Sequence, residues 1–306
     1  MPTVSIIMNC FNGEKYLREA IDSIYAQTFH DWEIIFWDNQ STDKSAEIAK
    51  SYDSRMKYHL ASEFLPVGAA RNKAMKKASG EFVAFLDTDD VFLPDHLEDL
   101  LKAFGPKTAV VYANFIIRDA TNGKEYIPFD AGREFHSGDI SKHLCKKNFI
   151  WLQAMIAKME YVRKLEETFD TALFTTEDFD FILRLSLVGG FNFVAKPTTV
   201  YRVHESSLTS RKRHYFAHDY SYMLVKYKDL LERSALKDLA RQYLLTVRLD
   251  LQVAGFKRFP FFLLWLSPRQ IAISIVFSLF GGSDIWEIKD KLLRPLRFFD
   301  KLLGKK

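Results

Sequence analysis

The amino-acid sequence predicts an α/β protein in which a mostly parallel central sheet carries helices on both faces and a helical region follows. In the first half of the chain, short apolar runs alternate with amphipathic segments, as strands and helices do along a parallel sheet. Polar and acidic side chains follow several apolar runs, at the strand ends where such sheets bind ligands. After about Arg213 the composition shifts, and helical patterns continue to the end.

The expected strands are short apolar runs, and the expected helices are segments such as 15–27, whose apolar residues recur at helical spacing. In chain order we predict strand 4–8, helix 15–27, strand 33–37, helix 45–51, strand 56–60, helix 67–77, strand 82–86, strand 109–117, a turn at Asn122–Gly123, a run at 125–129, helix 176–187 and strand 200–204. This order directs attention to 9–12, 38–43 and 87–90, which all follow strands.

Composition narrows the classes of function. The chain has 306 residues, 48% of them hydrophobic and 27% charged, which is an ordinary globular balance with enough length for a sizeable core. Two cysteines, Cys10 and Cys145, make no disulfide framework and fit a reducing, cytoplasmic setting. The first residues lack the basic segment of a secretory leader, so we expect a strand there. The sequence has no Walker-type loop and no Gly-x-Gly-x-x-Gly after the first strand, which argues against a kinase, an ATPase or a dehydrogenase.

The strongest local signal is the run Leu86-Asp87-Thr88-Asp89-Asp90 at the end of a hydrophobic strand. Crowded carboxylates repel one another unless a cation is present, and Mg²⁺ or Mn²⁺ prefers such oxygen ligands. The alternatives are a solvated turn, or a helix N-cap in which Asp90 caps a helix that begins near Pro94.

Four further polar segments lie beside predicted strands or helices. The segment 37–43 has polar side chains that suit a nucleobase edge, although Thr42 or Asp43 could instead cap the next helix. Arg71 opens a helix, where a cation is unfavourable for the helix dipole, so we expect it to meet a phosphate or a carboxylate.

The other two segments lie later in the chain. Glu177 and Asp178 open an apolar helix, either as a general base and its neighbour or only as acids at the positive end of the helix dipole. His204 is a candidate metal ligand or phosphate contact, or an ordinary structural histidine. Trp151 and Gln153 are candidates for contacts to a sugar ring, with a buried core position as the alternative for the Trp.

Taken together and in this order, the segments resemble the family-two inverting glycosyltransferases, which have the GT-A fold. The resemblance covers roughly residues 1–215 and rests on five segments: Val-Ser-Ile-Ile-Met-Asn-Cys-Phe-Asn, Trp-Asp-Asn-Gln-Ser-Thr-Asp, Gly-Ala-Ala-Arg-Asn, Leu-Asp-Thr-Asp-Asp and Thr-Glu-Asp-Phe-Asp-Phe. In the second segment, Asn39 stands where many members have a second Asp, so the contact to the base is altered there.

The resemblance implies a role for each matching position. Phe11 would lie near the nucleobase, and Asp178 is the first candidate for the base, with Glu177 second. The residues implied on the donor side are Asn9, Phe11, Asp38, Asn39, Arg71, Asp87 and Thr88. The implied ligands of a divalent metal, Mn²⁺ or Mg²⁺, are Asp87, Asp89 and His204.

The resemblance also implies a reaction and a domain plan. A sugar would pass by direct displacement from a nucleotide diphosphate-sugar, with UDP-sugars favoured, to a hydroxyl of a glycan or a lipid-linked glycan, in the synthesis of cell-surface polysaccharide. Residues 1–215 would form the catalytic domain, and 216–306 a helical, basic C-terminal region.

That C-terminal region carries the excess of basic over acidic residues. The chain has a formal net charge of +4, but residues 255–306 hold ten Lys and Arg against four acids. The apolar stretch 256–280 is interrupted by Pro268-Arg269, and 285–303 has the pattern of an amphipathic helix at an anionic membrane surface. We therefore expect a cytoplasmic protein, peripheral on the inner face of the cell membrane. The alternative is a helical subdomain that packs on the catalytic domain or on a second subunit.

Two other classes of function remain as alternatives. A nucleotidyltransferase also uses clustered carboxylates, but residues 9–13 lack its Gly-rich basic loop. A non-catalytic nucleotide-sugar-binding or membrane scaffold protein would not need both Asp89 and Asp178. We expect no nucleic acid partner, because the basic tail is too apolar and lacks a recognisable motif. The sugar, the acceptor and the oligomeric state stay open.

Overall fold

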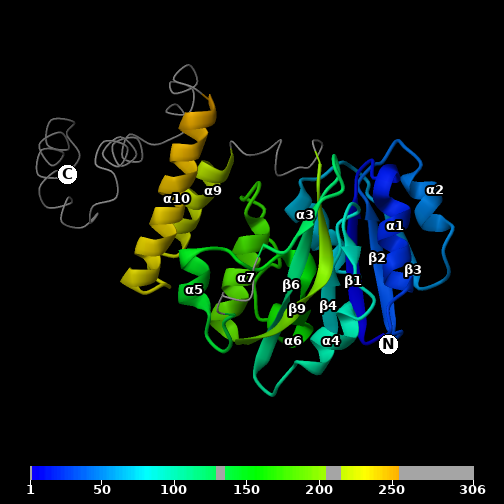
Figure 1. Ribbon diagram of the computed structural model, residues 1–306, viewed down its shortest axis with the longest axis horizontal. Coiled ribbons are helices and arrows are strands. Elements are labelled where there is room, and N and C mark those ends of the chain that lie inside the picture. The colour runs from blue at the N-terminus through cyan, green and yellow to red at the C-terminus, as the bar shows by residue number, and fades with distance from the viewer. Residues whose placement is uncertain (1, 129–134, 205–214, 255–306) are drawn as a thin grey trace, which may run out of the picture. The chain divides into compact units, whose positions relative to one another are not determined.

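The computed structural model describes residues 2–128, 135–204 and 215–254, and Figure 1 shows their path. The strands are β1 (Val4–Cys10), β2 (Trp32–Asp38), β3 (Met56–Leu60), β4 (Phe82–Phe85), β5 (Val91–Phe92), β6 (Thr108–Asp119), β7 (Glu125–Tyr126), β8 (Met155–Lys158) and β9 (Gly190–Val203). The helices are α1 (Glu14–Tyr25), α2 (Ser45–Lys50), α3 (Val67–Met75), α4 (His96–Lys102), α5 (Ser141–Lys146), α6 (Met159–Val162), α7 (Glu177–Val188), α9 (Phe216–Lys226) and α10 (Arg233–Ala254), with a 3-10 turn at Leu152–Ala154. The chain divides into two compact units, Met1–Tyr243 and Leu244–Lys306, and the first contains every candidate site residue.

One sheet organises the first unit. Its strand order is β3-β2-β1-β4-β8-β6-β9-β5, and β7 pairs with β6. The first four strands are parallel, so that Ile6 of β1 lies opposite Ile34 of β2 and Ala84 of β4. Beyond β4 the sheet is mixed, because β8 runs antiparallel to both β4 and β6 while β9 is parallel to β6. The predicted α/β fold with a mostly parallel sheet and flanking helices is confirmed.

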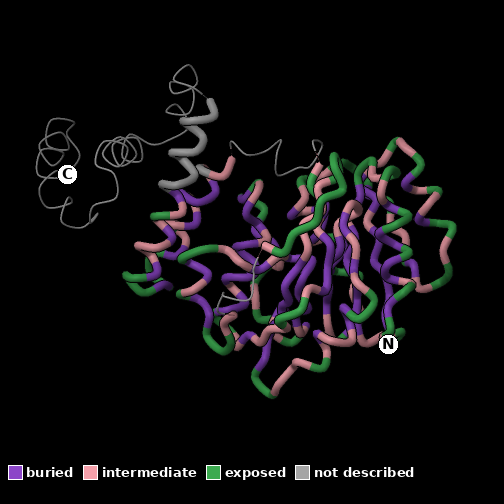
Figure 2. Tube along the Cα trace, in the orientation of Figure 1, coloured by how far each residue is buried: buried purple, intermediate pink, exposed green. Residues whose placement is uncertain are grey.

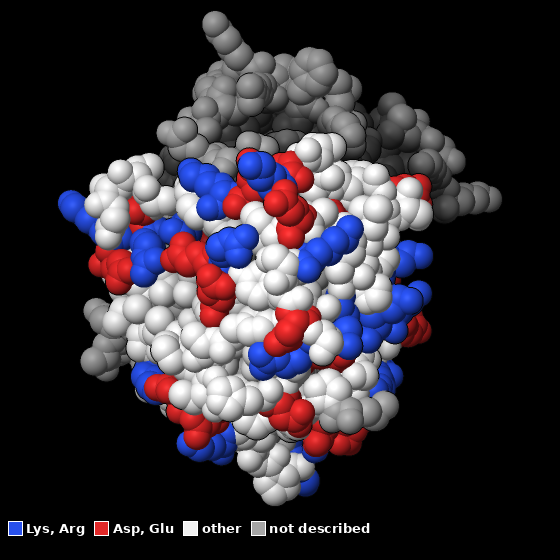
Figure 3. Space-filling view, turned by 90° about the vertical axis from the view of Figure 1, so that its right-hand side faces the viewer, with Lys and Arg blue, Asp and Glu red and all other residues white. Residues whose placement is uncertain are grey.

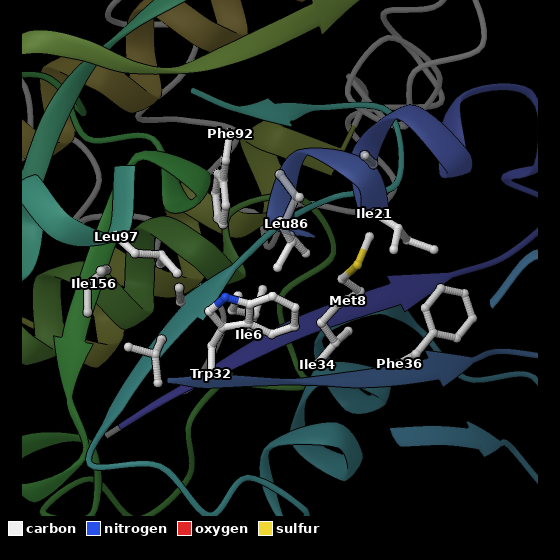
Figure 4. Close-up of a cluster of buried hydrophobic side chains, with 14 of the residues drawn as sticks. Ile6, Met8, Ile21, Trp32, Ile34, Phe36, Leu86, Phe92, Leu97 and Ile156 are labelled. Carbon is white, nitrogen blue, oxygen red and sulfur yellow. The ribbon is translucent and has the colours of Figure 1, made fainter. Parts of the chain in front are cut away.

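The alternation of side chains along β1 and β2 explains how one face of the sheet is covered. Ile6 and Met8 point to the same face as Ile34, since successive residues of a strand point to opposite faces. There they meet Ile21 of α1 and Leu97 of α4 in one buried cluster, which Figure 4 shows. Burying each such side chain stabilises the fold by roughly 1.5–3 kcal/mol.

Helices α3 and α7 lie on the other face of the sheet. α3 contacts β1 and β2, and the ring of Phe85 in β4 lies 5.9 Å from the ring of Phe181 in α7 and 5.5 Å from that of Phe169. Figure 2 shows that buried residues run along the strands between these two layers. The start of α7 is thereby fixed close to the carboxyl end of β4.

The late strand is much longer than the predicted 200–204. β9 begins at Gly190 and pairs with β6 along its length, with register irregularities next to Asn114. Pro197 lies at one of these irregularities, where a residue without an N–H is tolerated. Lys196 and Pro197 interrupt the apolar pattern, so the sequence predicted only the last part of this strand.

Two helix caps differ from the alternatives that the sequence offered. α4 begins at His96 with Asp95 as its N-cap, so Asp90 does not cap that helix; instead, its carboxylate accepts the backbone N–H of Arg202 at 2.9 Å. The N-cap residue of α2 is Lys44, while Asp43 immediately before it accepts the N–H of Ser45 at 2.9 Å.

The C-terminal region is helical as far as it is described, through α9 and α10. The apolar stretch 256–280 and the amphipathic pattern at 285–303 lie outside the described residues. Within the described ranges, no helix combines the length and the apolar character that crossing a membrane requires. On the side of the molecule shown in Figure 3, basic and acidic side chains are intermingled.

Candidate active site

The carboxyl ends of β1, β2 and β4 bring three polar loops together. The N–H of Asn39 donates to the carbonyl of Cys10 at 2.7 Å, and the N–H of Leu86 donates to the carbonyl of Ile7 at 3.0 Å. Gly13 allows a close approach between two of these loops, because a Cβ there would lie 2.9 Å from the hydroxyl oxygen of Thr88. The backbone therefore gathers at one edge the residues that the sequence separates.

Three carboxylates crowd the loop after β4. Asp87, Asp89 and Asp90 each offer an oxygen within 4.8 Å of the others. Burial raises the pKa of Asp89, and the Asp87 carboxylate raises it further. Burial and then the charge of Asp89 hold the pKa of Asp90 well above its usual value. This donor set fits Mg²⁺ or Mn²⁺, because hard cations prefer carboxylate oxygens and would relieve the repulsion among them.

The end of β9 lies against this acidic loop. His204 Nε2 is 2.8 Å from Asp89 Oδ2, so the predicted metal-site histidine lies beside the carboxylate cluster. Arg202 ties the same loop to β9, because its Nε donates to the carbonyl of Asp89 at 2.9 Å and its Nη2 to Glu19 at 2.7 Å. The sequence pointed to His204 but not to this anchoring role of Arg202, although residues two apart share a strand face.

Arg71 joins the acidic loop to the acid pair on α7. Its Nη2 lies 2.9 Å from Asp87 Oδ1 and its Nη1 lies 3.1 Å from Glu177 Oε1. The side chain is buried, which lowers its pKa, but Asp87, Glu177 and then Asp178 outweigh that effect and raise it. The guanidinium therefore stays charged and has carboxylate partners, as the sequence predicted, but Arg71 is the fifth residue of α3 and does not open that helix.

Glu177 and Asp178 differ in their surroundings. Glu177 is buried, and its Oε2 has no hydrogen-bond partner among the described residues. Burial raises the pKa of Glu177 to about 7, although Arg71 opposes the shift. Asp178 is partly exposed and accepts the N–H of Phe179 at 2.6 Å. Burial of its surroundings raises the pKa of Asp178 and Arg71 partly offsets this effect, so both acids retain protons more readily than free carboxyl groups.

Two exposed rings mark the outer side of the site. Phe11 is 50% exposed and Phe64 is 59% exposed, and their ring centroids are 4.8 Å apart in an edge-on arrangement. Large exposed aromatic side chains that contact each other often mark a binding surface. Phe64 carries no motif that could have singled it out in the sequence. On the inner side, Asn9 Oδ1 is buried without a hydrogen-bond partner among the described residues.

Asp38 and Asn39 are buried and hold the surrounding loops. Asp38 accepts the N–H of Ser41 at 2.8 Å and the hydroxyl of Tyr58 at 2.6 Å. Asn39 pairs with the backbone of Leu65, since its Nδ2 donates to that carbonyl at 2.8 Å and its Oδ1 accepts that N–H at 3.1 Å. Asn39 thus fixes the loop that carries Phe64.

Trp151 and Gln153 also lie at the site. Gln153 donates a hydrogen bond to the second carboxylate oxygen of Asp87. The ring of Trp151 lies 4.2 Å from that of Tyr201, and its indole N–H faces the carboxylate of Asp90 and partly offsets the rise in the pKa of that group. Both side chains therefore border the acidic loop.

Comparisons with known proteins agree with this arrangement. Residues 5–165 match the family model described as Glycosyl transferase family 2. The chain is 30% identical over 221 residues to the putative glycosyltransferase EpsH of Bacillus subtilis, a match covering 69% of this chain and 63% of that protein. It is 33% identical over 192 residues to an uncharacterized glycosyltransferase of Methanocaldococcus jannaschii, covering 60% and 64%. The chain thus spans less than two thirds of the length of these relatives.

Solved structures share the fold. The structure of S. aureus TarS 1-349 in complex with UDP-GlcNAc matches with a TM-score of 0.65 and 20% identity, over 88% of this chain and 77% of that one. The mannosyltransferase PcManGT from Pyrobaculum calidifontis, in complex with GDP-Man and Mn2+, matches with a TM-score of 0.55 and 17% identity, over 92% and 88%. At 20% and 17% identity, these two structures support the GT-A fold and nothing more specific. The family itself is shown by the family model, which matches more than half of the sequence. The chain belongs to glycosyl transferase family 2.

Proposed function

We propose that the protein is an inverting, metal-dependent glycosyltransferase that moves a sugar from a nucleotide diphosphate-sugar to a hydroxyl of a glycan or lipid-linked glycan. The observation that carries the proposal is Arg71, whose one guanidinium contacts Asp87 of the carboxylate cluster and Glu177 of the acid pair. A displacement at an anomeric carbon needs a cationic site for the departing diphosphate and a base across from it. The carboxylate cluster suits the first requirement because it can hold a cation, and the acid pair suits the second because it can supply the base.

The proposed reaction assigns a task to each end of the site. Asp178 takes the proton of the acceptor hydroxyl while that oxygen bonds to the anomeric carbon and the bond to the diphosphate breaks. Arg71 stabilises the negative charge that develops on the departing diphosphate. A divalent cation held by Asp87, Asp89 and His204 would supply further positive charge for that group. A positioned base contributes roughly 10²–10⁴-fold in rate.

The donor would lie along the edge formed by β1, β2 and β4. Phe11 would pack on the nucleobase, and Asn9, Asp38, Asn39 and Thr88 would line the remainder of the donor pocket. The buried, unpartnered Oδ1 of Asn9 supports this placement, because a ligand donor group would satisfy it. We favour a UDP-sugar, and TarS, which shares the fold, was solved with UDP-GlcNAc.

We place the catalytic domain at residues 1–215 and assign 216–306 to attachment at the inner face of the cell membrane, in the synthesis of cell-surface polysaccharide. The charge of the sequence supports the membrane part, since ten of its Lys and Arg lie in residues 255–306. Flotation with vesicles that contain anionic lipid tests it. A chain that stays at the bottom of the gradient at low salt would contradict the membrane assignment.

The first test of the reaction uses a panel of UDP-, GDP- and dTDP-sugars with Mn²⁺, with and without a chelator. We expect one donor to release nucleotide diphosphate only when the metal is present. Calorimetry with each nucleotide diphosphate completes this test. If no donor is hydrolysed and no nucleotide diphosphate binds with metal present, the transferase proposal fails and a scaffold function replaces it.

The second test concerns the base. We expect Asp178→Asn to lower kcat by about 10²–10⁴-fold and to leave the affinity for the donor unchanged, because the base acts on the acceptor. Asp99→Asn is the matched control, since Asp99 also lies in the first turn of a helix but on α4, paired with Lys196. Normal turnover of Asp178→Asn would remove Asp178 from this role, and Glu177→Gln would then be measured in the same way.

A further inference from the structure

The helix that carries the acid pair has no cap of its own. α7 begins at Glu177, and Thr176 occupies the N-cap position without a capping hydrogen bond from its side chain. Both acids lie in the first turn, where the direction of the helix start decides where their carboxylates point. Some other group must therefore fix the segment that leads into α7.

Asp219, on the distant helix α9, supplies that group. Its Oδ2 accepts the backbone N–H groups of Phe174 at 3.0 Å, Thr175 at 2.7 Å and Thr176 at 3.1 Å. The hydroxyl of Thr175 donates to the same oxygen at 2.8 Å. Asp219 is fully buried, so its charge has lost contact with water, and these donors replace that solvation.

A second contact holds α9 against α7. Lys226, at the end of α9, places its Nζ 2.7 Å from Asp180 in the first turn of α7 and 2.7 Å from Asp170. The hydroxyl of Tyr227 donates to the same Asp180 at 2.8 Å. With Asp219 on one side of the helix start and Lys226 on the other, α9 fixes that start at two points.

We propose that Asp219 is a positioning residue for the acid pair: it holds segment 174–176 so that Asp178 points toward the acceptor hydroxyl. The inference rests on the proposed function in so far as Asp178 is the base. Asp219 acts on the acid pair through the segment ahead of α7, so we expect it to contribute to the chemical step and not to donor affinity. A displacement of about 1 Å in a reacting group lowers the rate by up to roughly 100-fold.

The experiment compares three variants of the full chain. Asp219→Ala removes every acceptor, whereas Asp219→Asn keeps one carbonyl oxygen at the same place. The control for a general loss of stability is Leu239→Ala. Leu239 is a fully buried residue of α10, far in the sequence from segment 174–176, and the substitution removes most of its side chain. All are assayed at a temperature where each is folded by circular dichroism.

We expect Asp219→Ala to lower kcat by about 10–100-fold with the donor Kd unchanged, and Asp219→Asn to recover most of that loss. Leu239→Ala should keep the kcat of the original protein. The proposal is overturned if Asp219→Ala keeps kcat, if Leu239→Ala loses as much, or if Asp219→Ala weakens donor binding as strongly as it lowers kcat.

Hydrogen exchange separates this inference from the proposed function. We expect at least tenfold faster hydrogen exchange in Asp219→Ala than in Leu239→Ala at the backbone amides of Phe174, Thr175 and Thr176. Losing a hydrogen bond to a charged group changes the opening free energy by enough to give a ratio of this order. Unchanged exchange overturns the positioning role whatever the activity. Faster exchange with no transferase activity in the original protein would leave Asp219 holding the segment while the proposed function itself fails.

Discussion

Asn39 shows at the scale of one residue how a departure from the family pattern is accommodated. Its amide both donates to and accepts from the backbone of Leu65, and the side chain is buried. An Asp at this position could accept but not donate, and its charge would face the carbonyl of Leu65. The amide is therefore the chemically suitable group for this loop.

We accordingly expect Asn39→Asp to lower the free energy of unfolding by about 1–3 kcal/mol, the cost of an unsatisfied buried polar group. Unfolding in urea, at constant m-value, measures it. Asn148→Asp serves as the control, because the oxygen of Asn148 accepts the N–H of Ile150 at 3.2 Å and an Asp oxygen can accept it equally well. Equal stability of the two variants would contradict the role given to the Asn39 amide.

Residue 40 extends the same argument. Gln40 has φ of 71°, a left-handed conformation that favours glycine. The Gln side chain donates to the carbonyl of Ala61, a contact that glycine could not make. This hydrogen bond thus holds Gln40 in a backbone conformation that residues other than glycine seldom adopt.

At the scale of elements, α9 and α7 are joined by a partly buried ionic cluster. Lys226 lies between Asp170 and Asp180, and Asp180 also binds Arg184 at 2.7 Å. Breaking a buried pair from one side leaves charges without compensation, and this is more costly than never having the pair. The helix after the catalytic domain's predicted end at 215 is thus tied into the first compact unit.

Replacing Lys226 by Met should lower the free energy of unfolding by about 3 kcal/mol, because Asp170 and Asp180 lose the ammonium group that they share. Thermal or urea unfolding monitored by circular dichroism measures the change. Lys228→Met is a matched control on the surface, where Lys228 and Asp229 are both largely exposed and their pair contributes little. A loss no larger than that of the control would mean that the cluster does not hold the two helices.

At the scale of the whole molecule, the acid pair makes stability depend on pH. The pKa of Glu177 is about 7 in the fold, against an ordinary value of 4.5 for the unfolded chain. Between these values the folded protein holds a proton that the unfolded chain has lost. The free energy of unfolding therefore falls as pH rises through this window.

We expect metal-free protein to lose stability from about pH 4.5 to 7, with a contribution from Glu177 of at most about 1.4 kcal/mol per pH unit. Glu177→Gln cannot ionise and keeps an oxygen for Arg71, so its slope should be flatter by that amount. Urea unfolding at several pH values measures both slopes. Parallel slopes would show that Glu177 does not hold the proton.

The sequence by itself determined the fold class and pointed to most of the residues of the proposed site, although not to Phe64 or to the role of Arg202. Strands 56–60 and 82–86 and the helices flanking them were predictable because period and apolar runs are local properties, and local sequence fixes them. The acids at 87–90 and at 177–178 stood out for the same reason. Only the end of β9, at 200–203, was predicted, because the remainder of this strand is stabilised by pairing with β6 and not by its own composition.

Only the tertiary structure decided which of these groups meet. Arg71 lies 106 positions before Glu177 in the chain, and the local sequence around either residue does not predict that the two make contact. The same holds for Asp219 and the segment before α7, whereas the resemblance already implied that Asp89 and His204 lie at one metal site. The physical reason is that such contacts depend on how elements stack and on which ends of the strands coincide. A single sequence records neither, whereas the folded chain fixes both through the packing of its buried core.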